Sequence, residues 1–460
     1  MSPAFDVLVI GSGPAGEKAA MQAAKVNRRV AVVERPERLG GNCLHTATVP
    51  SKTLRETILY IAGVKQRSLS GIRATVGKNV TLEELLRRKD AVIGGQLEVL
   101  EQKLDRNEVT LLPGSARFLD PHRVEVVDAG ARREVTAAVI VIATGSRPAR
   151  HPDIPFDDRH VYDSDSILRL DTMPRTLTIV GAGVIGCEYA CMFALLGIKV
   201  TLIDTRPRVL DLVDHEIADL LVARMREHRI TLRLGEEVAA VRLEEPGRVV
   251  AETRSGKVVA SEKLLYAVGR EGNTADLALE RAGLTAGRRG LIPVNDHFQT
   301  AVPHIYAVGD VIGFPSLAAT AMHQGRRAMA HAFGVPVNGE GARLPYGIFT
   351  IPEISMVGET EEELTAAKVP YEIGQAFFRE IARGEIVGDR AGMLKLLFER
   401  ESHRLRGVHI IGEKASELVH IGQAVLAFGG PIEYFVETVF NYPTLSEAYK
   451  VAALNGLNRL

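Results

Sequence analysis

Cysteine is scarce in this sequence, and long apolar runs are missing. Only Cys43, Cys187 and Cys191 occur among 460 residues, too few for the disulfide framework of a secreted protein, so we expect a reducing compartment, most simply the cytoplasm. No apolar run reaches the roughly 18 residues that cross a bilayer, and we expect no membrane partner. The N-terminus, MSPAFDVLVIGSG, enters an expected strand directly and lacks the basic region and apolar core of a signal peptide.

Charge of either sign is not in excess either. Lys and Arg number 56 and Asp and Glu 57, which gives a formal net charge of −1. A nearly neutral chain offers no polyanion-binding surface, so nucleic acid is not expected as a partner. The hydrophobic share of 46% and the charged share of 25% are ordinary for a globular protein with a large core. The length allows two to four domains.

A glycine pattern is present twice, 170 residues apart. Each copy follows an expected strand, over residues 5–10 and 176–180, and opens an expected helix. In each copy an acid ends the next strand, 18 residues after the third glycine. The two sets are Gly11, Gly13, Gly16 with Glu34, and Gly181, Gly183, Gly186 with Asp204.

Each residue type in this pattern has a physical role in binding a dinucleotide. The first glycine permits a tight turn, the second lets backbone N–H groups approach a pyrophosphate, and the third lets helix and strand pack closely. The helix N-terminus attracts the phosphate charge, and the acid accepts hydrogen bonds from ribose hydroxyls. One such pattern alone can be a glycine-rich loop. Two in register, each with its acid, predict two bound dinucleotides.

Other segments have patterns of their own. Residues 81–104 predict an amphipathic helix, with Thr81 and Glu84 spaced as a capping box. Residues 107–148 alternate apolar and polar residues between turn signals, which predicts short antiparallel strands. From about residue 343 the chain changes to mixed strands and helices.

Taken together, these motifs resemble the two-dinucleotide-binding-domain flavoprotein disulfide reductases, the family of lipoamide dehydrogenase and glutathione reductase. The first glycine set and Glu34 resemble the family's FAD fingerprint, and the second set with Glu188 resembles its nicotinamide-nucleotide fingerprint. Three further motifs match: Ala143-Thr144-Gly145, Gly269-Arg270 with Asn273, and Ala307-Val308-Gly309-Asp310.

The resemblance implies an α/β fold. It would have two Rossmann-like dinucleotide-binding domains, for FAD and NAD(P), and a C-terminal α+β dimerisation domain. The expected boundaries are 1–149 and 270–342 for a discontinuous FAD domain, 150–269 for the NAD(P) domain and 343–460 for the dimer interface. A homodimer is implied, and stacking of dimers into larger assemblies stays open.

Two departures from the family pattern belong together chemically. The redox helix, GGNCLHTATVPSK, keeps Cys43 but has Thr48 where the second redox cysteine would stand. Near the C-terminus Tyr442 replaces the acid–base histidine, while Glu447 remains. A disulfide reductase needs two thiols and a base. A hydroxyl cannot form a disulfide, and an unperturbed phenol with a pKa near ~10 is a poor base at neutral pH.

Long stretches are similar to the soluble pyridine nucleotide transhydrogenase branch of the family, among them Tyr162-Asp-Ser-Asp-Ser166 and the ending FNYPTLSEAYKVAALNGLNRL. This resemblance implies FAD as cofactor and NAD(H) and NADP(H) as substrates. Hydride would pass from NADPH to flavin N5 and then to NAD⁺, reversibly and in a ping-pong cycle, with no redox-active disulfide.

The resemblance also implies roles for individual residues. Lys52 and Glu188 would pair beside flavin N5, and Tyr442 with Glu447 stand where the catalytic dyad would be. The other expected cofactor-binding residues are Gly11, Gly13, Gly16, Glu34, Gly41, Cys43, Thr48, Thr144, Gly145, Gly181, Gly183, Gly186, Asp204, Arg206, Gly269, Arg270, Gly309 and Asp310.

Asp204 creates a conflict in coenzyme choice. An acid there suits the ribose of NAD(H) but repels a 2′-phosphate, whereas Arg206 and Arg208 could bind that phosphate. Cys187 and Cys191 have no nearby His or Cys partner in the sequence, so we expect core packing and no metal site. Three alternatives remain: an NAD(P)H oxidase or diaphorase that reduces oxygen or quinones, a degenerate disulfide reductase, and a catalytically silent scaffold.

Overall fold

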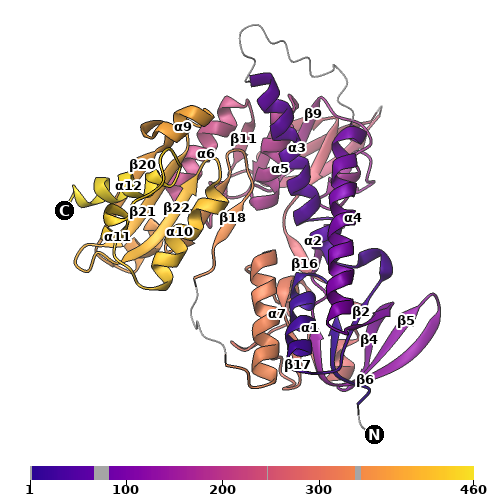
Figure 1. Ribbon diagram of the computed structural model, residues 1–460. Coiled ribbons are helices and arrows are strands. Elements are labelled where there is room, and N and C mark those ends of the chain that lie inside the picture. Colours follow the sequence, from indigo (N-terminus) through magenta and orange to yellow (C-terminus); the bar gives the residue numbers. More distant parts are fainter. Residues whose placement is uncertain (1–2, 67–81, 246, 337–342) are drawn as a thin grey trace. The chain divides into compact units, whose positions relative to one another are not determined.

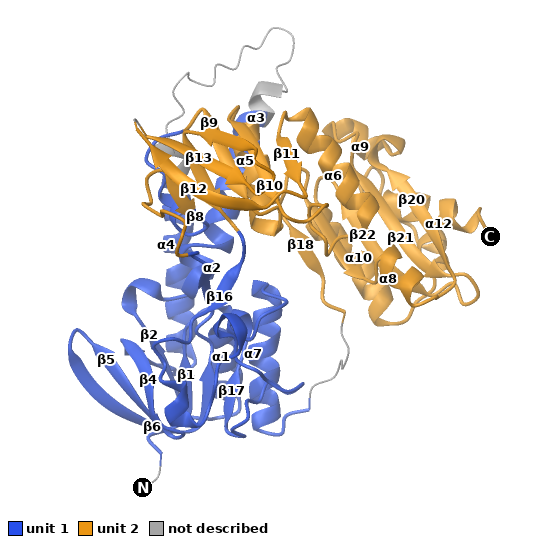
Figure 2. Cartoon of the chain, turned by 180° about the vertical axis from the view of Figure 1, so that it is seen from behind, with its two compact units in different colours: residues 1–151, 163–173, 268–340 blue, residues 152–162, 174–267, 341–460 orange. Residues whose placement is uncertain are grey.

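The computed structural model describes residues 3–66, 82–245, 247–336 and 343–460. Two compact units form from interleaved segments (Figure 2). Unit 1 comprises residues 1–151, 163–173 and 268–340, and unit 2 comprises residues 152–162, 174–267 and 341–460. The predicted capping box of Thr81 and Glu84 lies outside the described side chains. Within the described residues, no helix is both long and apolar enough to cross a membrane.

Unit 1 is built on a seven-stranded sheet in the order β3-β2-β1-β6-β5-β4, with β17 beside β6. The strands of unit 1 are β1 (Phe5–Ile10), β2 (Val30–Glu34), β3 (Thr110–Pro113), β4 (Ser115–Asp120), β5 (Arg123–Asp128), β6 (Ala131–Ile142), β7 (Ser146–Pro148), β16 (Arg270–Gly272) and β17 (Ile305–Ala307). Its helices are α1 (Pro14–Lys25), α2 (Gly41–His45), α3 (Thr48–Gln66), α4 (Leu82–Arg106) and α7 (Ala318–Ala332).

The central strand β1 is buried on both faces from Val7 to Ile10, which explains the unbroken apolar run of these four residues. Val7 and Val9 pack with α1 and α7 on one face, where Figure 1 shows these two helices side by side. Leu8 and Ile10 pack in a second core on the other face. A parallel strand covered on both sides needs apolar residues at every position.

The prediction of antiparallel strands over residues 107–148 is confirmed for β4, β5 and β6 and wrong for β3. β3 pairs in parallel with β2, at the edge of the nucleotide-binding sheet. The reason is topological: α4 crosses back before β3, so the strand enters the sheet in the direction of β1. The long strand β6 joins the antiparallel and the parallel strands of this sheet, because it pairs antiparallel with β5 and parallel with β1.

Unit 2 contains three sheets. A five-stranded sheet has the order β11-β10-β9-β15-β8, a small sheet has the order β12-β13-β14, and an antiparallel C-terminal sheet has the order β18-β19-β22-β21-β20. The strands of the first two sheets are β8 (Val161–Asp163), β9 (Thr176–Val180), β10 (Lys199–Asp204), β11 (Thr231–Leu234), β12 (Val238–Glu244), β13 (Arg248–Thr253), β14 (Val258–Ser261) and β15 (Lys263–Tyr266).

The C-terminal sheet has its own apolar core, which includes Phe398, Phe435 and Tyr449. Its strands are β18 (Tyr346–Ile348), β19 (Ile354–Gly358), β20 (Tyr371–Phe377), β21 (Met393–Glu399) and β22 (Leu405–Ile411). The helices of unit 2 are α5 (Val184–Leu195), α6 (His215–Glu227), α8 (Glu361–Ala366), α9 (Ala382–Val387), α10 (Ala415–Ala427), α11 (Glu433–Glu437) and α12 (Glu447–Leu457).

Candidate functional site

The first glycine pattern forms the turn from β1 to α1 in unit 1. Gly11 has φ +104°, in the region that favours glycine, and a Cβ there would overlap the Ala143 carbonyl. A Cβ on Gly16 would overlap the carbonyl oxygen of Gly11. Gly13 is the N-cap of α1. Glycine at these positions therefore brings the helix N-terminus directly onto the end of the strand.

Glu34, at the end of β2, is held beside this turn. Its Oε2 accepts hydrogen bonds from Ser12 N and Ser12 Oγ, both at 3.0 Å. Ser12 Oγ in turn accepts from Gly40 N at 2.9 Å, which ties the turn to the segment before α2. Sequence reasoning missed Ser12, although its place between Gly11 and Gly13 marks it as the small polar residue nearest the acid.

The backbone here fits the pyrophosphate of a dinucleotide. Gly41, at φ +63°, lies so close to the turn that a Cβ on it would be 2.9 Å from Gly13 Cα. Two glycines without side chains thus meet at the N-terminus of α1, whose backbone N–H groups and dipole attract phosphate. Glu34 is positioned to accept from a ribose. These backbone and carboxylate groups fit the pyrophosphate and a ribose of a dinucleotide such as FAD.

The predicted motifs around residues 145, 270 and 310 meet at Ser146. Ser146 Oγ donates to Asp310 Oδ2 at 2.8 Å and accepts from Arg270 Nε at 2.8 Å. Arg270 Nη2 also donates to the Ser146 carbonyl at 2.9 Å. Gly309 N donates to Gln324 Oε1 on α7 at 2.8 Å. Ser146 therefore holds Asp310 directly, Arg270 holds Ser146, and Gln324 holds the neighbouring backbone at Gly309.

Asn273 completes this junction. Its backbone N donates to the Gly145 carbonyl and its side-chain Nδ2 to the Thr144 carbonyl, both at 3.0 Å. Gly269 accepts from Ala149 N at 3.0 Å, where β16 pairs with β7. The sequence motifs identified these residues, but the connecting residues Ser146 and Gln324 were missed, because their partners lie far away in the sequence.

Cys43 and Thr48 meet at the junction of α2 and α3. The Thr48 side chain, on the first residue of α3, lies near the Cys43 thiol. Burial raises the pKa of the Cys43 thiol above its ordinary value, and the nearby Thr48 side chain only partly opposes this. The thiol is therefore protonated at neutral pH and poorly nucleophilic. Lys52 follows on the same helix, α3.

The second glycine pattern repeats this geometry in unit 2, between β9 and α5. Gly181 has φ +108°, Gly183 is the N-cap of α5, and a Cβ on Gly186 would overlap the Gly181 carbonyl. Asp204 Oδ2 accepts from Ala182 N at 2.5 Å, just as Glu34 accepts from Ser12 N. Two turns of equivalent geometry are thus present.

Arg206 neutralises Asp204 in this second turn. Arg206 Nε donates to Asp204 Oδ1 at 2.9 Å and Nη2 to Oδ2 at 2.7 Å. Burial alone would raise the pKa of Asp204, but the hydrogen bonds from Arg206 and Ala182 N hold it below its ordinary value. Arg206 Nη2 also lies 3.8 Å from the position of a Cβ on Gly183. Arg208 does not join them and pairs with Asp219 on α6 at 2.8 Å.

Glu188 is buried on α5, and its Oε1 accepts a hydrogen bond from Phe349 N at 2.8 Å. Its expected partner Lys52 belongs to unit 1, so the Lys52–Glu188 pair stays a prediction. Cys187 and Cys191 are buried in the same helix, as their predicted core packing requires. Among the described residues, no group of three or more His, Cys, Asp or Glu residues is arranged to hold a metal ion.

Tyr442 and Glu447 do not bind one another within the described chain. The Tyr442 side chain is 74% exposed, while Glu447 stands at the start of α12. Glu447 Oε2 is buried and has no hydrogen-bond partner in the described part of the structure. The phenol is therefore free to face solvent or a second subunit.

Comparison with known proteins identifies the family. Residues 5–325 match the family described as pyridine nucleotide-disulphide oxidoreductase, and residues 344–453 match the dimerisation domain of the same family. The two matches together cover most of the chain. The chain belongs to this family. Members are FAD-dependent, in agreement with the two dinucleotide-binding turns and the family resemblance of the sequence.

Several relatives are similar over their full length. A protein of Mycobacterium tuberculosis named soluble pyridine nucleotide transhydrogenase is 52% identical over 459 residues, which are 99% of this chain and 98% of that protein. A protein of Hahella chejuensis with the same name is 48% identical, and 99% of each chain is covered.

Solved structures agree with the fold. LpdA from M. tuberculosis has a TM-score of 0.91 at 28% identity, covering 97% of this chain and 99% of LpdA. The flavoprotein disulfide reductase RclA from Escherichia coli has a TM-score of 0.87 at 26% identity, covering 98% and 99%. The predicted fold class, two Rossmann-like domains followed by a dimerisation domain, is confirmed.

Proposed function

We propose that this protein is an FAD-dependent soluble NAD(P)⁺ transhydrogenase that works without a redox-active disulfide. NADPH and NAD⁺ would use one site in turn, in a reversible ping-pong cycle. The observation that carries the proposal is that Thr48 lies near a buried, protonated Cys43 thiol, because a hydroxyl at this position cannot close a disulfide with it. The names of the relatives at 52% and 48% identity support the same activity.

The residues of unit 1 would hold FAD. Gly11, Gly13 and Gly41 give the backbone surface for the pyrophosphate, Glu34 accepts from the ribose, and Asp310 faces the remaining polar chain. When bound, FAD would supply reversible two-electron chemistry between nicotinamides. The protein would orient the reacting rings and provide the electrostatic field around them. Lys52 and Glu188 are proposed to pair beside the reacting ring.

Asp204 and Arg206 support the use of both coenzymes at one site. For NAD(H), the Asp204 carboxylate accepts from the adenosine ribose hydroxyls. For NADP(H), the Arg206 guanidinium supplies the positive charge and the paired donors that a 2′-phosphate requires. Since Asp204 is already neutralised by Arg206, it repels the phosphate less than an isolated carboxylate would.

We propose the domain division 1–149 with 270–342, 150–269 and 343–460, and a homodimer formed through the last of these. The match of residues 344–453 to a dimerisation domain supports this assembly. So does the exposure of apolar side chains in that region, since Phe428 and Val439 are each 91% exposed. Tyr442 and Glu447 would then lie at the dimer contact, at the positions of the family's catalytic dyad.

Anaerobic rapid mixing tests the proposed activity. The oxidised holoenzyme is mixed with NADPH and then with a thio-analogue of NAD⁺, while flavin absorbance and thio-NADH formation are recorded. We expect NADPH to bleach the flavin and the analogue to restore it without oxygen, with parallel double-reciprocal plots. Restoration only by oxygen or a quinone would instead identify an oxidase or diaphorase. A long-wavelength thiolate–flavin band after two-electron reduction would identify a disulfide reductase.

A further inference from the structure

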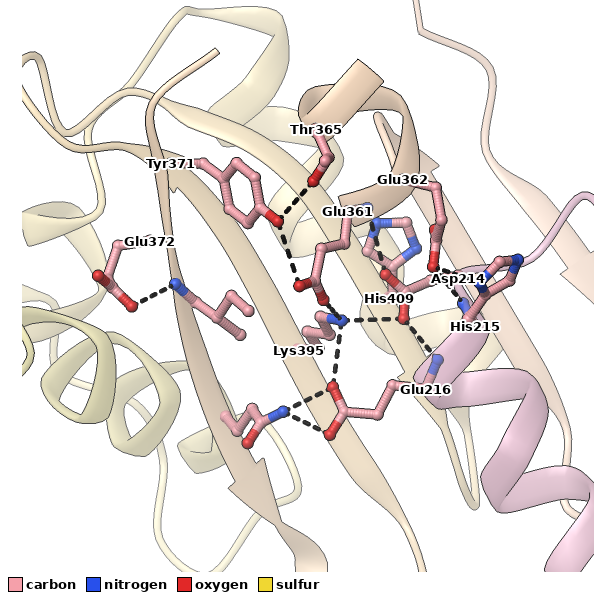
Figure 3. Close-up of polar contacts among 12 residues, drawn as sticks. Asp214, His215, Glu216, Glu361, Glu362, Thr365, Tyr371, Glu372, Lys395 and His409 are labelled. Atoms are coloured by element: carbon pink, nitrogen blue, oxygen red, sulfur yellow. Dashed lines mark hydrogen bonds and ion pairs between the residues drawn. The ribbon is translucent and has the colours of Figure 1, made fainter. Parts of the chain in front are cut away.

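A fully buried lysine lies in the C-terminal sheet of unit 2, outside the sites described above. The side chains of Lys395 on β21 and of Asp214, just before α6, are both 0% exposed. Figure 3 shows Lys395 Nζ among three carboxylates: Asp214 at 3.0 Å, Glu216 at 3.1 Å and Glu361 at 2.5 Å. Burial alone would lower the pKa of Lys395, but these carboxylates raise it above its ordinary value, so the ammonium stays charged.

Asp214 connects this cluster to α6. Its Oδ1 accepts from Glu216 N at 3.2 Å, as the N-cap of the helix. Its Oδ2 accepts from Glu361 N on α8 at 3.3 Å. One carboxylate thus fixes the start of α6 against both α8 and the C-terminal sheet. A buried charge cluster with several partners has one favourable geometry, because moving any member leaves a buried charge unpaired.

The segment that ends at Asp214 begins at the proposed coenzyme residues. Residues 205–213 connect β10 to α6 and carry Arg206. Leu210 N donates to the Ala182 carbonyl at 3.1 Å, next to the second glycine turn. Leu210 also has φ +51°, a left-handed conformation that is unfavourable for a leucine and must be held by its surroundings. Val209 and Val213 on either side are buried.

We infer that Lys395 is a positioning residue for coenzyme binding. Through Asp214 it holds the far end of residues 205–213, and this segment holds Arg206 over the turn at Gly183. The inference rests on the proposed coenzyme role of Asp204 and Arg206. Without Lys395, the segment is free to leave its strained conformation. The adenosine end of NADPH should then bind more weakly, while the chemistry of bound coenzyme is unchanged.

Lys395→Met tests this role, because it removes the charge and keeps most of the side-chain volume. The matched control is Arg406→Met on the neighbouring strand β22. Within the described chain, Arg406 pairs with Glu359 and Glu399 at 2.6 Å each and with no residue of α6. The control therefore loosens the same sheet without releasing α6. Titration calorimetry of the holoenzyme with adenosine 2′,5′-bisphosphate measures binding without any electron transfer.

We expect Lys395→Met to weaken the binding of adenosine 2′,5′-bisphosphate about 3- to 30-fold, which is the range of coupling energies through a connected network. The KM for NADPH should rise by a similar factor, with kcat at saturation unchanged and Arg406→Met like wild type. The inference would be overturned if folded Lys395→Met bound the nucleotide as tightly as wild type. It would also be overturned if Arg406→Met lost as much affinity as Lys395→Met. A wild-type enzyme that fails to bind the nucleotide would instead remove the proposed coenzyme site itself.

A second variant protects the test against misfolding. Asp214→Asn keeps a good N-cap for α6 but removes the charge that Lys395 holds. It should also weaken the binding of adenosine 2′,5′-bisphosphate, but by a smaller factor than Lys395→Met, because Glu216 and Glu361 still bind the ammonium. An unchanged affinity in this variant would also count against the inference.

Discussion

At the scale of single residues, the pair of Cys43 and Thr48 is the main support for the proposal that no redox-active disulfide takes part. The Cys43 thiol is made less acidic by burial, and its neighbour offers a hydroxyl that cannot be oxidised to a disulfide. The second missing part is a base, since Tyr442 is largely exposed and is not hydrogen-bonded to Glu447 within the described chain. In the proposed function, the thiol relay of a disulfide reductase is thus interrupted at two independent points.

Restoring one of these points should not restore the activity. Thr48→Cys gives Cys43 a possible disulfide partner but leaves Tyr442 in the place of the base. Since general acid–base catalysis contributes roughly 10²- to 10⁴-fold, we expect no appreciable oxidation of dihydrolipoamide with NAD⁺. The coupled assay is run beside the transhydrogenase assay on the same preparation. Appreciable dihydrolipoamide turnover in the single variant would show that one missing thiol, and no base, separates the two activities.

Asp204 should set the balance between the two coenzymes. Asp204→Asn keeps the acceptor for Ala182 N and removes the negative charge, which frees Arg206 for a 2′-phosphate. We expect the dissociation constant of NADPH to fall by about tenfold, equivalent to about 1.4 kcal/mol, and that of NADH to rise. Stopped-flow reduction with each coenzyme measures both. Unchanged or weaker NADPH binding would mean that Asp204 does not face the phosphate.

At the scale of elements, the two glycine turns could be predicted because all their interactions are local. The strand, the turn, the helix and the acid lie within about thirty residues, so the pattern and its physics coincide. The direction of β3 was missed, since it depends on the helix that precedes it. Ser146 and the pair of Asp214 with Lys395 were also missed. The latter two residues lie 181 positions apart, and nothing near either of them in the sequence indicates the other.

The two turns offer a matched pair of variants. Gly16→Ala and Gly186→Ala each place a Cβ against the carbonyl of the first glycine of their own turn, so the helix must move away from the strand. Overpacking of this kind costs typically 1–3 kcal/mol. We expect Gly16→Ala to be purified with little FAD, and Gly186→Ala to retain FAD but to be reduced slowly by NADPH. The flavin-to-protein ratio of each purified variant measures its FAD content, and the rate of flavin reduction by NADPH measures its use of the coenzyme.

The opposite pattern would contradict the assignment of the turns. Loss of FAD in Gly186→Ala, with normal FAD content in Gly16→Ala, would mean that FAD binds at the second glycine turn and the nicotinamide coenzyme at the first. Equal loss of FAD in both variants would show that the substitutions act through general unfolding.

At the scale of the whole molecule, buried carboxylates connect stability to pH. Asp163 in unit 1 and Asp214 in unit 2 both have pKa values below the ordinary range. For Asp214, burial alone would raise the pKa, but His409, the positive charge of Lys395 and the bond from Glu361 N lower it. A carboxyl whose pKa is depressed by folding stabilises the native state only while it is ionised.

Asp214→Asn should therefore cost stability at neutral pH and progressively less in acid. The contribution of Asp214 is complete above its unfolded pKa of about 3.9 and is lost as the pH falls toward the lower native pKa. At pH 7 the loss should stay below the roughly 3–5 kcal/mol typical of a broken buried pair, because Lys395 keeps two carboxylates. Thermal unfolding of the holoenzyme between pH 3 and about 7 measures the gap, which is the difference in the free energy of unfolding between wild type and the variant.

The gap should be constant down to about pH 5 and should close below about pH 4, since wild type alone loses the ion pair there. An Asp276→Asn variant, at an exposed aspartate of unit 1, controls for a general effect of removing one acid and should follow wild type throughout. A gap of constant size down to pH 3 would mean that Asp214 carries no charge in the native state. The ammonium of Lys395 would then be balanced by Glu216 and Glu361 alone, and the start of α6 would be fixed by its cap and not by its charge.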